Sequence, residues 1–146
     1  MDQTEQQARL TALKAERAEL EAAREAKLVE REASDELERE ERAIRELKAL
    51  EKLEEEHGPI GKKWDRVDTF EGMICVKRPH PATWKKFAEL DKVKSEDADR
   101  FVRPCRIYPD VPEFNRLIEE EPAALIRCAT KCCELAGLRR SEIQGK

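Results

Sequence analysis

The first 57 residues contain no glycine, proline, cysteine or aromatic residue. All five glycines, seven prolines, five cysteines and seven aromatic residues follow position 57. Without aromatic side chains this N-terminal arm has little from which to build a hydrophobic core, and without glycine or proline nothing in it interrupts a helix. Only the body that follows can be globular, and a body of that size is marginally stable on its own.

Long apolar runs are also missing. No stretch of about 18 apolar residues occurs, which argues against a membrane-spanning helix. The N-terminus MDQTEQQARLTALK is polar and acidic, so it predicts no signal peptide. The cysteines are odd in number, and without a signal peptide we expect reduced thiols in the cytoplasm.

Catalytic and metal-binding motifs are absent too. There is no glycine-rich phosphate loop, G-x-S-x-G or H-E-x-x-H motif. The one candidate general base, His80, lies between two prolines, where a helix-capping role is sufficient. Cys128, Cys132 and Cys133 lack the paired spacing of zinc sites, and small buried thiols explain them better. We therefore expect no enzyme, no cofactor and no metal.

The arm is predicted to be one helix over residues 3–56, about 80 Å long at 1.5 Å per residue. Residues 1–57 carry 11 basic and 18 acidic side chains, net −7, and residues 58–146 carry 18 and 15, net +3. One interpretation is a coiled coil or partner-docked helix, and the other is a solvated helix with (i, i+4) ion pairs such as Glu38–Arg42. The coiled-coil seam has 4,3 spacing, is rich in alanine and also includes glutamates. Its apolar positions are Ala12, Ala15, Ala22, Ala26, Val29, Ala33, Ala43, Leu47 and Leu50.

The junction between arm and body is marked by the sequence HGPIG at residues 57–61. Glycine followed by proline stops a helix, and we expect residues 58–63 to form a hinge.

Residues 64–77 are predicted to form a β-hairpin. A two-residue turn at Glu71-Gly72 would place Val67 opposite Val76 and Asp65 opposite Arg78. Because glutamate is unfavourable at a positive φ, a longer loop around Gly72 is expected instead.

Four short helices are expected after the hairpin. His80 caps the first, whose apolar face carries Trp84, Phe87 and Leu90. Ser95 and Asp110 cap the second and third, separated by a link at CRIYPD, and the fourth runs from Pro122 to Gly137. The predicted fold class is α+β, with an arm (1–57), a hinge (58–63), a body (64–138) and a loose tail (139–146).

A basic belt with interleaved aromatic residues raises the question of nucleic-acid binding. The body is only mildly basic and the arm is acidic, so a solvated basic face is the simpler interpretation. The belt consists of Lys77, Arg78, Lys85, Lys86, Arg100, Arg103 and Arg106.

The order of features over residues 64–138 resembles the small tail assembly chaperones of long-tailed bacteriophages. A hairpin leads into VKRP, then TWKKF, RPCRIYP, EFNRLIEEEPAAL and a closing ELAGL. The resemblance implies a short β element followed by helices, with no catalytic function. It also implies binding to the tape measure protein, a long helical chain, and recruitment of tail tube subunits in the bacterial host cytoplasm. Compact members of that family lack such an arm, which we expect to serve self-association or docking.

The resemblance implies an apolar groove for a helical client. Its lining would come from those aromatic residues that remain accessible, the alternative being that all are core. The candidates are Trp84, Phe87, Phe101, Tyr108 and Phe114. Two other functions stay open: a structural adaptor or virion component that uses the arm as a strut, and a nucleic-acid-binding protein that uses the basic belt.

Overall fold

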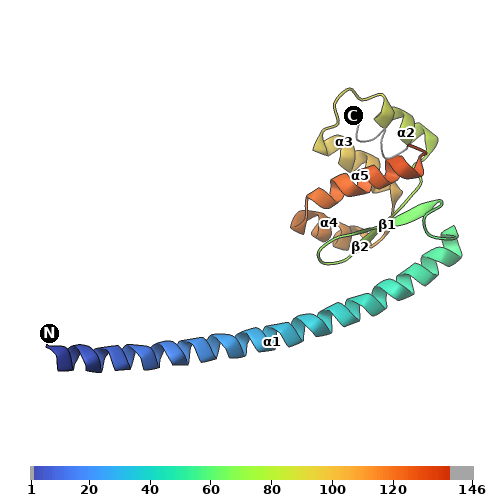
Figure 1. The fold of residues 1–146 in the computed structure, drawn as a ribbon. Helices are drawn as coiled ribbons and strands as arrows, with labels where there is room; N and C mark the ends of the chain where they lie inside the picture. The colour runs from blue at the N-terminus through green and yellow to red at the C-terminus, as the bar shows by residue number, and fades with distance from the viewer. Residues whose placement is uncertain (1, 139–146) are drawn as a thin grey trace. The chain divides into compact units, whose positions relative to one another are not determined.

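The computed structural model describes residues 2–138, so the expected tail at 139–146 lies outside the described residues (Figure 1). The fold is mixed, as predicted, with a long N-terminal helix, a small antiparallel sheet and several short helices. The elements are α1 (Gln3–His57), β1 (Trp64–Asp68), β2 (Met73–Lys77), α2 (Pro81–Ala88), α3 (Ser95–Val102), a 3-10 turn η1 (Arg103–Cys105), β3 (Arg106–Tyr108), α4 (Val111–Glu120) and α5 (Ala123–Leu135).

Helix α1 is uninterrupted over 55 residues, which confirms the single-helix prediction. At its start the Asp2 carboxylate accepts a hydrogen bond from the backbone N–H of Glu5 at 2.7 Å. At its end Gly58 adopts a φ of 87°, a conformation that few residues other than glycine tolerate.

The sheet has three antiparallel strands in the order β1-β2-β3. Val67 pairs with Ile74 and Asp65 with Val76, so the register of a two-residue turn is not adopted. The hairpin is closed by the longer loop expected around Gly72. The Thr69 hydroxyl donates to the Gly72 carbonyl at 2.6 Å and accepts from the Gly72 N–H at 3.0 Å, and these bonds fix the four-residue loop.

The third strand lies where the sequence predicts only a link, at CRIYPD. Strand β3 is only three residues long, and it pairs with β2 through Cys75–Tyr108 and Val76–Arg106 across an irregularity in register. So short a segment carries no alternating pattern, and only the free edge of β2 makes it a strand.

The four predicted helices are all present, and their caps follow the sequence with one correction. His80 Nδ1 accepts from the Ala82 N–H at 3.2 Å, and the Asp110 carboxylate accepts from the Glu113 N–H at 3.1 Å. Ser95 is the first helical residue rather than the cap, so Lys94 occupies that position.

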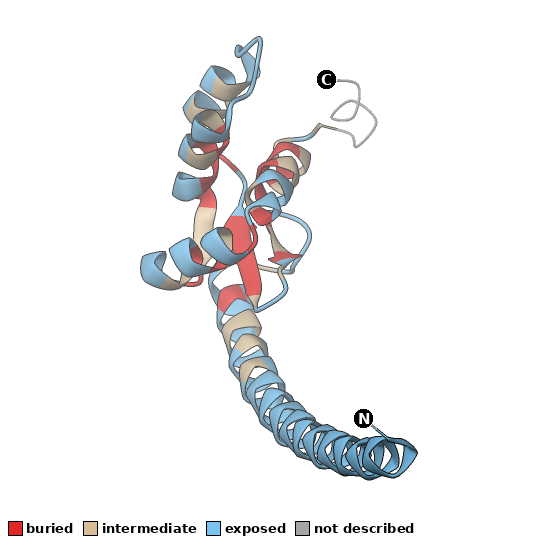
Figure 2. Cartoon of the chain, turned by 90° about the vertical axis from the view of Figure 1, so that its left-hand side faces the viewer, coloured by how far each residue is buried: buried red, intermediate tan, exposed pale blue. Residues whose placement is uncertain are grey.

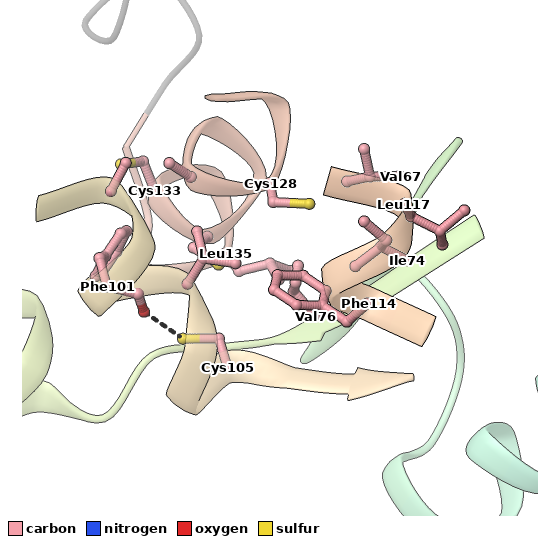
Figure 3. Close-up of a cluster of buried hydrophobic side chains, with 14 residues drawn as sticks. Val67, Ile74, Val76, Phe101, Cys105, Phe114, Leu117, Cys128, Cys133 and Leu135 are labelled. Carbon is pink, nitrogen blue, oxygen red and sulfur yellow. Dashed lines mark hydrogen bonds between the residues drawn. The ribbon is translucent and has the colours of Figure 1, made fainter. Parts of the chain in front are cut away.

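Strand β2 is buried on both faces. On one face Ile74 and Val76 join Val67 and side chains from α3, α4 and α5 in the main core, which includes the fully buried Phe114 (Figure 3). On the other face Met73 and Cys75 pack with Trp64 and Leu53 in a second, smaller core. Partly buried Ala49, Leu50, Ile107 and Tyr108 complete the second core.

The last turns of α1 therefore belong to the body. The chain forms two compact units, one up to Ile44 and one from Arg45 onward. The compact body therefore starts earlier than the predicted boundary at residue 57. A side-chain bond fixes this end of the helix, because Glu46 accepts from the Met73 N–H at 3.0 Å. In the expected hinge, the Trp64 indole N–H donates to the Gly58 carbonyl at 2.8 Å.

Leu53→Ala tests this docking of α1. We expect the free energy of unfolding to fall by about 2–3 kcal/mol, because the leucine is buried between α1 and the sheet. Leu47→Ala, on the same helix but 63% exposed, is the matched control and should change it by no more than about 0.5 kcal/mol. Urea unfolding followed by tryptophan fluorescence measures both, and equal effects would show that this end of α1 does not pack on the sheet.

Candidate functional site

An open groove lies between helices α2 and α3. Its volume is about 290 Å³. The proline-rich corner at the end of β2 starts α2 at Pro81, and α3 begins where the Asp97 carboxylate accepts from the Lys94 N–H at 3.0 Å. The groove is lined by Thr83, Lys86, Phe87, Leu90, Asp97, Arg100, Phe101 and Pro104.

Aromatic rings form the floor of the groove. Phe87 of α2 stacks on Phe101 of α3 with ring centroids 4.0 Å apart and planes inclined by 7°. Trp84, one turn before Phe87, has its ring centroid 6.1 Å from that of Phe101. Phe101 is buried, whereas Trp84 and Phe87 are only half-buried and leave apolar surface accessible beside the main core.

The five predicted partner-binding aromatics therefore separate into two groups. Trp84, Phe87 and Phe101 come together, and Phe87 and Phe101 line the groove. Phe114 is fully buried in the main core, and Tyr108 packs against the second core on β3, so neither lies at the groove.

Two cations stand at the rim of the groove, Lys86 on α2 and Arg100 on α3. Both are exposed, and neither has an ion-pair partner among residues 2–138. The rim also contains Asp97, but its carboxylate is engaged in the cap of α3. The groove thus combines an apolar floor with two cations and one anion at its rim, a net charge of +1.

The predicted basic belt does not form one free surface. Arg78 donates to the Leu135 carbonyl at 3.0 Å, and Arg106 donates to the Pro109 carbonyl at 2.5 Å. Arg103 pairs with Asp99 at 2.8 Å and lies 5.3 Å from the centroid of the Phe114 ring. Lys77, Lys85, Lys86 and Arg100 remain exposed and without an ion-pair partner in the described part of the chain.

The predicted seam of the arm is open to solvent along nearly all its length (Figure 2). Leu50 is different, since it packs against the second core of the body. Exposed seam positions are Ala12, Ala15, Ala22, Ala26, Val29, Ala33, Ala43 and Leu47.

All five cysteines are buried, and none of them is in a disulfide. Burial raises the pKa of Cys75 and of Cys128 to about 12. The hydrogen bond with Cys105, followed by burial, raises the pKa of Cys132 well above the usual thiol range. The Cys105 thiol also donates to the Phe101 carbonyl at 3.5 Å (Figure 3). The raised pKa values keep the thiols of Cys75, Cys128 and Cys132 in the protonated form, which is a poor nucleophile and a poor metal ligand.

Residues 2–138 contain no group of three or more His, Cys, Asp or Glu side chains placed to hold a metal ion. Nor does any helix in that range have the length and apolar character needed to cross a membrane.

Four side chains that line the groove were not among the predicted site residues: Thr83, Leu90, Asp97 and Pro104. The predicted apolar face of the first short helix included Leu90, which the structure places just beyond the end of α2. Phe70, at the tip of the hairpin loop, is 83% exposed. Its sequence neighbours, Thr69 and Glu71, indicate a loop but not an exposed ring.

Comparison of the chain with models of known protein families, with curated proteins and with solved structures finds no match.

Thiol reactivity tests the description of the cysteines. At pH 8 we expect the folded protein to react only slowly with a disulfide reagent such as DTNB, because every thiol is buried and out of reach of the reagent. In urea all five thiols should react rapidly, and the number of thiols that react there is the internal control. A thiol that reacts at the unfolded rate in native protein would contradict the buried assignment.

Proposed function

We propose that this protein binds an amphipathic helix of a partner protein in the groove between α2 and α3. The observation that carries the proposal is the combination of the stacked Phe87–Phe101 floor with the unpaired cations Lys86 and Arg100 at the rim. Apolar anchors at spacings of three, four and seven residues on a client helix suit such a floor. Acidic residues flanking those anchors would pair with the rim.

The resemblance to tail assembly chaperones extends this proposal to a biological client. On that basis the client is a helical segment of the tape measure protein, bound in the bacterial host cytoplasm before the tail polymerises. Covering the apolar face of such a segment would protect it from aggregation, and a modest groove suits a client that must later be released. Recruitment of tail tube subunits would then need a second surface. This role is non-enzymatic and requires no cofactor.

Binding to peptides that cover the helical segments of the tape measure protein of the same genome tests this function. Fluorescence anisotropy of the labelled peptides should show at least one segment that binds the full chain. Leu90→Glu should weaken that binding by about tenfold or more, because it places a carboxylate beside the apolar floor. Ile126→Glu, on α5 and 67% exposed, adds the same charge outside the groove and should leave binding unchanged.

Equal loss of binding in the two variants would contradict the groove, and absence of any binding segment would contradict the client. Two further outcomes would favour other functions. Recovery of the protein in fixed stoichiometry from mature particles would support a structural strut. Steeply salt-dependent binding to single-stranded DNA, lost on Lys85→Glu and Lys86→Glu, would support nucleic-acid binding.

A further inference from the structure

The arm carries apolar side chains that nothing in the described chain covers. Val29, Ala33, Leu37 and Ile44 follow one another at spacings of four, four and seven residues, which places them on one face of a helix. All four are exposed; Leu37, the largest near the middle of this stripe, is 62% exposed. An apolar stripe of this kind is what a groove between two helices would bind.

The charge around the stripe is strongly acidic. Residues 30–41, with sequence EREASDELEREE, contain seven acidic and two basic side chains, net −5. The whole of residues 1–44 has 13 acidic and 8 basic side chains, also net −5, so this block accounts for the net charge of residues 1–44. By contrast residues 77–106, which include α2 and α3, contain nine basic and five acidic side chains, net +4. The stripe and the groove are therefore complementary in charge as well as in apolar character.

We propose that the segment Val29–Ile44 of one copy of this chain binds in the α2–α3 groove of a second copy. Leu37 would rest on the Phe87–Phe101 floor, with Glu36, Glu40 and Glu41 available to the rim cations. A coiled coil between two arms fits this sequence less well than the arm–groove contact. Its seam with 4,3 spacing would place the charged side chains of Glu36 and Glu40 in the apolar interface.

Such a contact joins two different surfaces, an arm and a groove, so it is heterologous. Two copies can each place their arm segment in the groove of the other, which gives a closed dimer. If the pairing is not reciprocal, each groove takes the arm of a further copy and a longer chain of copies forms. If the proposed client also enters the groove, then client and arm compete for it. That second step rests on the proposed function, whereas the arm–groove contact does not.

Sedimentation velocity of the full chain over a range of concentrations tests the contact. We expect the wild-type protein to self-associate. Leu37→Lys should abolish self-association because it adds a cation that faces Lys86 and Arg100, and Leu90→Glu should abolish it because it adds an anion to the groove. Leu20→Lys and Ile126→Glu are the matched controls, on exposed apolar positions of the arm and body outside the proposed contact, and should behave as wild type.

Mixing the two disrupted variants makes the test specific. The L37K chain keeps an intact groove and the L90E chain keeps an intact arm stripe, so together they should form a heterodimer although neither associates alone. Self-association lost in L37K but retained in L90E would show an arm–arm coiled coil and overturn the proposal. A wild-type monomer at all concentrations would overturn it as well.

The same variants separate this contact from client binding. L37K leaves the groove intact and should bind the tape measure peptides at least as tightly as wild type, since no arm competes. If no peptide binds but the mixed variants still associate, the proposed function fails and the arm–groove contact stands. If peptides bind and the mixed variants remain monomeric, the arm–groove contact fails and the proposed function stands.

Discussion

Strand β2 must be covered on both faces, and the arrangement of the body depends on this requirement. Its residues Met73, Ile74, Cys75 and Val76 are consecutive and apolar, so neither face can be left to solvent. Helices α3, α4 and α5 bury one face. The other face is covered by the end of α1, held there by Leu53 and by the bond from Met73 to Glu46. Ile107 and Tyr108 of β3 add to this cover.

The small size of the body also accounts for the groove. A small domain cannot enclose every aromatic ring, and here Phe114 and Trp64 are the largest fully buried side chains of the two cores. Trp84 and Phe87 remain at the edge on α2, where one neighbouring helix covers them only in part. The proposed occupants, an acidic arm from a second copy and an acidic client helix, would bury apolar surface that the chain cannot bury by itself.

Local signals in the sequence were sufficient for most of the secondary structure. The absence of breakers predicts α1, and His80, Asp110 and Gly58 mark helix ends where the structure has them. Features that depend on residues distant in the sequence were not predictable. Strand β3 forms because it pairs with the free edge of β2. The end of α1 joins the body because its side chains bury Trp64. For the site, the helical spacing after Pro81 indicated Trp84, Phe87 and Leu90 together, although α2 itself ends at Ala88. No local pattern distinguishes Phe101, which completes the groove, from Phe114, which lies in the core.

The packing of Leu53 against Trp64 also limits how this chain can be divided. Gly58 and Pro59 resemble a domain boundary, yet a chain that began there would expose the Met73 and Cys75 face of the sheet to water. Exposed apolar strands promote aggregation, so a domain that began at this boundary would be unstable on its own. A gene fusion or deletion that exchanged the arm would preserve the body only if its breakpoint lay near Ile44, within the continuous helix. For the fold of the body, the arm before Ile44 can vary in length, whereas its final turns cannot.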